Sequence, residues 1–349
     1  MINILIVDDS EVERNILKNI FQSDKEINVI GFASNGKEAI DLNEKLKPDL
    51  ITMDIHMPFM DGIEAIKHIM SHQPTPIVVI SSTLNNKELN TTYRSLDAGA
   101  LCVLEKPVNI NSPQFDTYIT RVTQTIRAMA EVKVIKRRFH VSTLKSKPIL
   151  PKEYSHRDYQ IIAIGTSVGG PQVLNKILAD LPDQFPIPIV IVQHMTVGFM
   201  EGFVKWLDDH IPLKVKMAED QEILRGGIIY FAPDHQHLEI IRKGPEQLSV
   251  QLTQGKPVSG FCPSATVLLN SVAKACDNNA IGMLLTGMGN DGAKGLLAIK
   301  HAGGHTIIQD PSSAVVFGMA GVAQSLGAVD KIVELEQISH YLKLLAPPH

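Results

Sequence analysis

A serine in a glycine-rich turn is the first residue of this sequence that could do chemistry. Ser167 lies in Gly165-Thr166-Ser167-Val168-Gly169, which follows the apolar run 161–164 and precedes Pro171. The apolar run predicts a buried parallel strand, and Pro171 suits the first turn of a helix. A strand, a tight turn and a helix expose one side chain at the edge of a sheet, and the G-x-S-x-G spacing is that of a nucleophile elbow. Two alternatives stay open at this point, a capping serine in a structural turn and a phosphate- or dinucleotide-binding turn.

A serine nucleophile needs a base, and the base needs an orienting carboxylate. The apolar run 188–193 predicts a buried strand that ends on His194, and the run 281–285 predicts another that leads into a glycine-rich turn with Asp291. Because parallel strands end at the same edge of a sheet, we expect Ser167, His194 and Asp291 to meet there. A capping or surface role for the histidine and the aspartate is the alternative. The order Ser, His, Asp differs from that of α/β hydrolases, which does not exclude catalysis because triads recur on unrelated folds.

Other histidines and the cysteines do not predict a metal site. His235 and His237 form an isolated H-x-H pair after the predicted strand 228–231, without further ligands at a recognised spacing. The three cysteines are too few and too scattered for a disulfide framework or a zinc site: Cys102, Cys262 and Cys276. They suit a reducing compartment.

The first half of the chain alternates apolar runs with helical stretches, which predicts a parallel doubly wound sheet. The predicted strands cover residues 2–7, 28–33, 48–53, 77–80 and 100–104. Polar side chains follow four of them, at the edge where such sheets bind ligands: Asp8, Asp9, Asp54, Ser81 and Lys106. Crowded carboxylates need a cation, and an all-oxygen acidic pocket suits Mg²⁺. Asp54 could then attack a phosphoryl donor, with Ser81 and Lys106 contacting the phosphoryl oxygens. The alternative for each residue alone is a solvated loop charge.

Size and charge bound the remaining possibilities. The chain has 349 residues, enough for about two domains, and its net charge of −4 provides no basic footprint for nucleic acid. No apolar run is long enough to cross a bilayer, and the N-terminus lacks a positively charged leader. We therefore expect a cytoplasmic protein without membrane insertion.

We expect an α/β fold with two doubly wound parallel-sheet domains and a linker between them. The first domain covers residues 1–124, the linker 125–157 and the second domain 158–349. Lysines and arginines are concentrated between residues 133 and 152, and two prolines interrupt this stretch. Such a composition indicates a solvated, partly extended tether, and a docking role for it stays open.

The first half closely resembles a response-regulator receiver domain, over about residues 1–124. The stretches that carry the resemblance are 6–10, 53–62, 80–82 and 105–107. The resemblance implies that Asp54 accepts a phosphoryl group from a histidine kinase, and that Ser81 and Lys106 sense it. It also implies a Mg²⁺ site made by four residues: Asp8, Asp9, Asp54 and the main-chain carbonyl of His56. Val103 stands where such domains often carry an aromatic switch residue.

The second half resembles the protein-glutamate methylesterase domain, over about residues 158–345. The stretches that carry the resemblance are 164–171, 192–195, 230–233, 285–293 and 315–319. With the receiver in front, the whole chain resembles the chemotaxis response-regulator methylesterase (CheB) family. The resemblance implies that Ser167 is the nucleophile, that His194 is the general base and that Asp291 orients it. The Met288 main-chain N–H is the implied oxyanion donor.

The resemblance also implies a reaction and its partners. The substrate is a glutamyl γ-methyl ester on a chemoreceptor, and receptor glutamines are deamidated by the same chemistry without a cofactor. Phosphorylation of Asp54 activates the esterase, and the protein is a monomer. Departures at Val168, at 260–264 and at Ala320-Gly321 concern the choice of substrate. The alternatives are a non-catalytic signalling adaptor and a hydrolase of the same mechanism that acts on an unrelated ester or amide.

Overall fold

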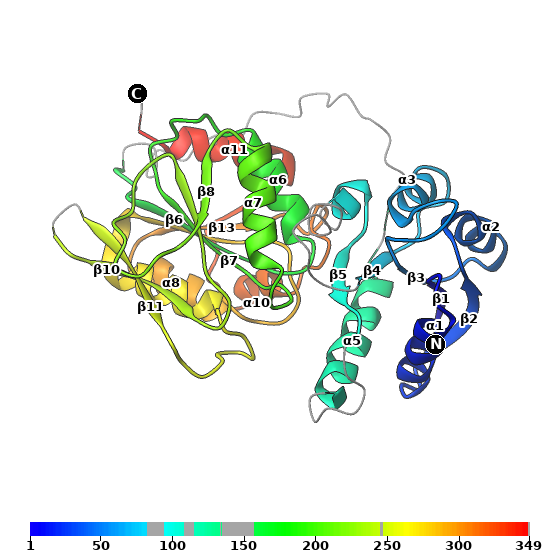
Figure 1. The fold of residues 1–349 in the computed structure, drawn as a ribbon. Coiled ribbons are helices and arrows are strands. Elements are labelled where there is room, and N and C mark those ends of the chain that lie inside the picture. The colour runs from blue at the N-terminus through cyan, green and yellow to red at the C-terminus, as the bar shows by residue number, and fades with distance from the viewer. Residues whose placement is uncertain (82–93, 108–114, 133, 135–156, 245–246, 348–349) are drawn as a thin grey trace. The chain divides into compact units, whose positions relative to one another are not determined.

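The computed structural model describes residues 1–81, 94–107, 115–132, 134, 157–244 and 247–347 (Figure 1). The chain divides into two compact units, residues 1–141 and 142–349. Each unit has a parallel sheet with helices, so the predicted α/β class with two doubly wound domains is confirmed. Helix α5 (Phe115–Ala130) continues past residue 124, and residues 135–156 of the predicted linker lie outside the described residues.

The first unit contains a five-stranded parallel sheet in the order β2-β1-β3-β4-β5. The strands are β1 (Ile2–Val7), β2 (Ile27–Ala33), β3 (Leu50–Met53), β4 (Ile77–Ser81) and β5 (Cys102–Glu105). The helices that accompany α5 are α1 (Glu11–Gln22), α2 (Gly36–Leu46) and α3 (Gly62–His72). Helix α1 packs on α5 and α2 packs on α3. The strand order leaves β1, β3 and β4 in the middle, with their carboxyl ends at one edge.

Polar caps fix where these helices begin. Ser10 accepts a hydrogen bond from the N–H of Glu13 and caps α1. Asn35 and Asp61 do the same for α2 and α3. Each cap satisfies an N–H that the first helical turn leaves without an intrahelical partner.

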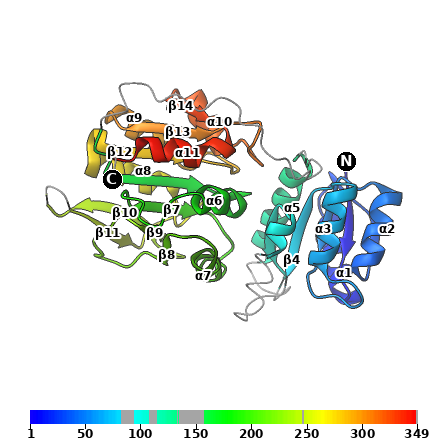
Figure 2. The ribbon, with the colours of Figure 1, turned by 90° about the horizontal axis from the view of Figure 1, so that it is seen from above.

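The second unit contains a seven-stranded sheet in the order β14-β13-β12-β6-β7-β9-β8, which Figure 2 shows from one edge to the other. The strands are β6 (Ile161–Thr166), β7 (Ile189–Gln193), β8 (Lys214–Met217), β9 (Ile228–Phe231), β12 (Ala280–Leu284), β13 (His305–Gln309) and β14 (Lys331–Val333). All neighbouring strands pair in parallel.

Helices cover this sheet in two groups that pack among themselves. One group contains α8 (Ala265–Cys276), α9 (Ala293–His301) and α10 (Met319–Ser325); the other contains α6 (Gly170–Ala179), α7 (Met200–His210) and α11 (Leu335–Leu345). A short hairpin of β10 (His237–Arg242) and β11 (Leu248–Thr253) packs on α8. This hairpin is antiparallel and was not predicted from the sequence.

The register of the central strands positions the site. Strand β6 lies between β7 and β12, with Thr166 opposite Gln193 and Gly165 opposite Leu284. Every residue of these three strands is buried, because helices or the hairpin cover both faces. The turns that follow these three strands, which carry Ser167, His194 and Asp291, therefore emerge at one edge of the sheet.

Candidate active site

Ser167 lies in the sharp turn between β6 and α6. The N–H of Gly170 donates to the Ser167 carbonyl oxygen over 2.9 Å, and Gly169 has a φ of 75° that favours glycine. A Cβ atom at Gly170 would collide with the side-chain oxygen of Gln193. The turn therefore needs glycine at 169 for its backbone conformation and at 170 for the close approach to Gln193, as expected for the predicted nucleophile elbow.

Main-chain hydrogen bonds bring the turns after β6, β7 and β12 together. The Ser167 N–H donates to the Thr286 carbonyl over 3.0 Å, and the His194 N–H donates to the Thr166 carbonyl over 2.9 Å. The buried side-chain amide of Gln193 donates to the carbonyls of both Ser167 and His194, over 2.8 and 2.7 Å. Hydrogen bonds to main-chain groups thus hold the turns of Ser167 and His194 beside each other.

His194 and Asp291 form a direct pair. The Nε2 atom of His194 lies 2.9 Å from Oδ2 of Asp291, and their side chains are 5% and 0% exposed. Asp291 also accepts from the Ser264 hydroxyl over 2.7 Å and from the N–H groups of Ala265 and Thr266 over 2.7 and 3.1 Å. Burial alone would raise the pKa of Asp291, but the hydrogen bonds from His194, Ser264 and Thr266 outweigh it and hold this pKa at about 2. The carboxylate is therefore ionised at neutral pH.

The pair with Asp291 decides which nitrogen of His194 can act as a base. Because a carboxylate only accepts, Nε2 carries the proton and Nδ1 carries the lone pair of the neutral ring. Nδ1 is buried and finds no hydrogen-bond partner in the part of the chain that the structure describes. Within that part no hydrogen bond joins Ser167 Oγ to His194 either, as is common before substrate binds.

The main-chain N–H groups of Val168 and Met288 belong to two segments that lie next to Ser167. A Cβ atom on Gly287 would lie 2.8 Å from the Ser167 Cβ, and the Thr286 hydroxyl donates to the Val168 carbonyl over 2.8 Å. The segment that leads to Met288 therefore runs directly beside Ser167. Neither the Met288 N–H nor the Val168 N–H donates to an acceptor among the described residues. The Val168 N–H was missed from the sequence, although the residue after the nucleophile commonly supplies such a donor.

In the first unit, three carboxylates converge at the carboxyl edge of the sheet. Oxygens of Asp8, Asp9 and Asp54 lie within 4.8 Å of one another. Lys106 Nζ lies 2.7 Å from Asp8 and 3.1 Å from Asp54. Burial raises the pKa of Asp54, and the Lys106 ammonium opposes that rise while the Asp8 carboxylate adds to it. One lysine leaves this cluster with an excess of negative charge.

The remaining receiver residues lie around this cluster. Ser81 is buried at the end of β4, and its carbonyl accepts the Lys106 N–H over 2.9 Å. His56 lies in the loop after β3, two residues beyond Asp54, and its side chain is exposed. Its main-chain carbonyl accepts no hydrogen bond from the described residues. An all-oxygen donor set with excess negative charge fits a hard cation such as Mg²⁺.

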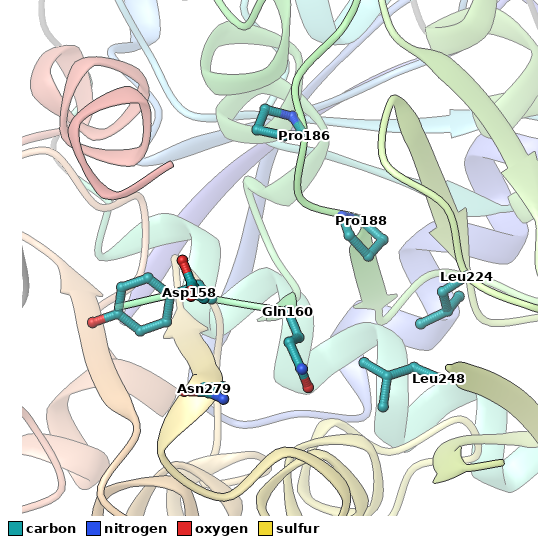
Figure 3. Close-up of a pocket in the computed structure, with 8 residues that line it drawn as sticks. Asp158, Gln160, Pro186, Pro188, Leu224, Leu248 and Asn279 are labelled. Atoms are coloured by element: carbon teal, nitrogen blue, oxygen red, sulfur yellow. The ribbon is translucent and has the colours of Figure 1, made fainter. Parts of the chain in front are cut away.

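The structure also contains a hollow away from these residues (Figure 3). Its lining comes from segments that precede β6, β7 and β12 and from two leucines: Asp158, Tyr159, Gln160, Pro186, Pro188, Leu224, Leu248 and Asn279. The hollow therefore lies at the amino ends of the strands, opposite the edge where Ser167, His194 and Asp291 meet. None of the predicted site residues lines it.

The two sites define a class of protein: a receiver-like domain with a carboxylate cluster, joined to a second α/β domain in which Ser167, His194 and Asp291 emerge at one sheet edge. Comparisons with known proteins give the family. Residues 4–113 match the response regulator receiver domain, and residues 162–342 match the CheB methylesterase domain. The chain is 43% identical over 350 residues to protein-glutamate methylesterase/protein-glutamine glutaminase 1 of Syntrophus aciditrophicus, covering 99% of each chain. It is 43% identical to the protein-glutamate methylesterase/protein-glutamine glutaminase of Nitrosospira multiformis, covering 97% of this chain and 95% of that one.

A solved structure agrees with these matches. The crystal structure of the Thermotoga maritima CheB methylesterase catalytic domain is 35% identical, with a TM-score of 0.51, and covers 53% of this chain and 97% of its own. The chain belongs to the CheB methylesterase family, and it is a carboxylic ester hydrolase with a receiver domain. The family resemblance predicted from the sequence is confirmed. Among the helices in the described part of the chain, none combines the length and apolar character needed to cross a membrane.

Proposed function

We propose that this enzyme hydrolyses glutamyl γ-methyl esters on a chemoreceptor, and deamidates receptor glutamines by the same acyl transfer. The observation that carries the proposal is the His194–Asp291 pair. The Nδ1 atom of His194, which has no partner among the described residues, lies at the same sheet edge as the Ser167 turn. A substrate on the cytoplasmic part of a receptor would place the enzyme in the cytoplasm.

In the proposed reaction Ser167 Oγ attacks the ester carbonyl carbon and passes its proton to Nδ1 of His194. Asp291, with its pKa held at about 2, stabilises the imidazolium that forms. The C–O bond to the methoxy group then breaks, and methanol leaves with the proton from His194. Water then attacks the acyl-enzyme while His194 takes a proton from it. The bond from the acyl carbon to Ser167 Oγ breaks, His194 returns the proton to Oγ, and the receptor leaves with a glutamyl side-chain carboxylate.

The negative oxygen of the tetrahedral intermediate would lie between the N–H groups of Val168 and Met288. Both groups donate to no described acceptor, so they need not break a hydrogen bond to bind it. Such preorganised donors are commonly the largest single contribution to acyl transfer. The chemistry needs no cofactor.

We propose that phosphorylation of Asp54 by a histidine kinase raises the esterase rate. Bound Mg²⁺ would neutralise the phosphoryl oxygens, and the residues that would hold it are Asp8, Asp9, Asp54 and the His56 carbonyl. Lys106 and Ser81 would contact the transferred phosphoryl group. For this, phosphorylation has only to stabilise one of two conformational states of the protein more than the other.

The test compares methylated receptor fragments with unrelated esters. The parent enzyme should remove the methyl groups from receptor glutamyl residues, measured as a loss of mass by mass spectrometry, and Ser167→Ala should not. Hydrolysis of unrelated esters only would favour a different substrate. Binding of the receptor fragment without any demethylation would favour the non-catalytic signalling adaptor.

A further inference from the structure

His237, one member of the H-x-H pair, has a defined place next to the site. Its side chain lies at the start of β10 and is 4% exposed. Its Nδ1 lies 3.2 Å from the Ser264 N–H nitrogen, and its Nε2 lies 3.1 Å from the Lys256 carbonyl oxygen. Because an N–H only donates and a carbonyl only accepts, the ring is neutral with its proton on Nε2. Both nitrogens are engaged.

These two bonds join the ends of one loop. The loop covers residues 254–264 and connects β11 to α8. A Cβ atom on Gly255 would lie 2.9 Å from the His237 ring, so the loop wraps closely around that ring. At its tip Val258 and Phe261 exchange two main-chain hydrogen bonds of 3.0 Å. The ring of His237 thus holds both ends of the loop, and a tight turn fixes its tip.

The same loop carries two contacts to the proposed triad. The Phe261 ring stacks on the His194 imidazole with centroids 3.7 Å apart and an interplanar angle of 1°. The Ser264 hydroxyl donates to Asp291 over 2.7 Å. Phe261 therefore limits the tilt of the His194 imidazole. Ser264 fixes the Asp291 carboxylate that binds Nε2 of the same ring.

We infer that His237 is a positioning residue for the triad, an inference that rests on the proposed function. By holding the Lys256 carbonyl and the Ser264 N–H, it sets the loop that places Phe261 on His194 and Ser264 on Asp291. It touches neither substrate nor the reacting atoms. Its effect passes through a continuous path of contacts: His237, Ser264, Asp291 and His194.

Two substitutions separate the two bonds of His237. His237→Asn keeps an acceptor near Nδ1 for the Ser264 N–H but does not reach the Lys256 carbonyl. His237→Gln keeps a donor for Lys256 and loses the Ser264 bond. The matched control is His235→Asn, because His235 is exposed and its φ of 64° is one that asparagine tolerates.

The expected result is a loss of kcat for receptor demethylation by about ten- to a hundred-fold in His237→Gln, with KM within about two-fold, because misplaced catalytic groups cost rate rather than binding. His237→Asn should recover part of that loss, and His235→Asn should match the parent. Proton NMR gives a second readout that does not need turnover. The hydrogen-bonded Nε2–H of His194 should give a downfield signal in the parent that shifts or broadens in His237→Gln.

Retention of parental kcat and of the unshifted proton signal by folded His237→Gln would overturn the inference. If the parent does not hydrolyse the ester, the proposed function fails, whereas the NMR comparison still decides whether His237 positions His194. A His237→Gln protein that does not fold leaves His237→Asn, which should show a smaller change of the same kind in kcat and in the signal.

Discussion

The Nε2 atom of His194 lies 2.9 Å from Oδ2 of Asp291, and the Nδ1 atom on the other side of the ring has no partner among the described residues. This arrangement assigns the proton to Nε2 and leaves Nδ1 with the lone pair that the proposed mechanism uses as the base. Four donors converge on the Asp291 carboxylate, from His194, Ser264, Ala265 and Thr266. An imidazolium formed on His194, as we propose, would therefore meet a fixed negative charge.

Replacing Asp291 by asparagine should lower kcat by about four orders of magnitude, the scale expected when the orienting carboxylate of a triad is lost. The amide nitrogen would face at least one of the donors that the carboxylate accepts, so the ring would lose its orientation. Methanol release by Asp291→Asn under saturating substrate measures this. A rate within ten-fold of the parent would contradict the role of Asp291.

The low pKa of Asp291 predicts a loss of stability in acid. A carboxyl group whose pKa falls on folding, here from 3.8 to about 2, stabilises the fold above pH 4, and this contribution is lost as the pH falls towards 2. The difference corresponds to about 2 kcal/mol of unfolding free energy. The single tryptophan, Trp206 in α7, reports on the catalytic unit alone.

Urea unfolding followed by Trp206 fluorescence at pH 6 and pH 3 tests this prediction. The advantage in stability of the parent over Asp291→Asn should shrink as the pH is lowered. Asp183→Asn, the same substitution at an exposed position, serves as the control. A constant difference between parent and Asp291→Asn would contradict the assigned pKa.

Adding one methyl group at Gly287 should disturb Ser167 selectively. The new Cβ would lie 2.8 Å from the Ser167 Cβ and 2.5 Å from the Met319 sulfur, so the nucleophile or its neighbours must move. A displacement on the order of 1 Å lowers the rate by about a hundred-fold. Gly244→Ala, whose Cβ would meet only an ordinary contact, is the matched control for kcat. Equal kcat in both variants would show that this close approach does not matter.

Mg²⁺ should stabilise the receiver domain through its carboxylates. Ligand at a hundred times its dissociation constant adds about 2.7 kcal/mol to the folded state, which raises the Tm. Asp9→Asn should lose this increase while leaving the Lys106 pairs with Asp8 and Asp54 intact. The exposed Glu11→Gln is the control, and calorimetric melting with Mg²⁺ and with EDTA distinguishes the variants. A parental increase in Asp9→Asn would remove Asp9 from the metal site.

The central strands could be predicted from the sequence because they are buried on both faces and read as unbroken apolar runs. Strand β12 ends one residue before the predicted strand, at Leu284, and Leu285 already belongs to the turn. Ser167, His194 and Asp291 could be grouped because parallel strands share an edge. The fold and the choice of candidates thus followed from local pattern.

The supporting contacts could not be predicted in this way. Ser264 and Asp291 are 27 residues apart, and the pairing of His237 with Ser264 depends on how a hairpin packs on α8. Spacing along the chain carries no signal for such contacts. The choice between Nε2 and Nδ1 of His194 depends on the orientation of its ring, which the sequence does not specify.

The central claim is that Ser167 performs the esterase chemistry and that Asp54 controls its rate. The most direct test is methanol release from methylated receptor fragments by the parent, Ser167→Ala and Asp54→Ala, with and without Mg²⁺ and a small phosphodonor. The phosphodonor should raise the parental rate, Asp54→Ala should lose that rise, and Ser167→Ala should release no methanol under any condition. Methanol release by Ser167→Ala at the parental rate would contradict the account. So would a parent enzyme that is phosphorylated on Asp54 but releases no methanol.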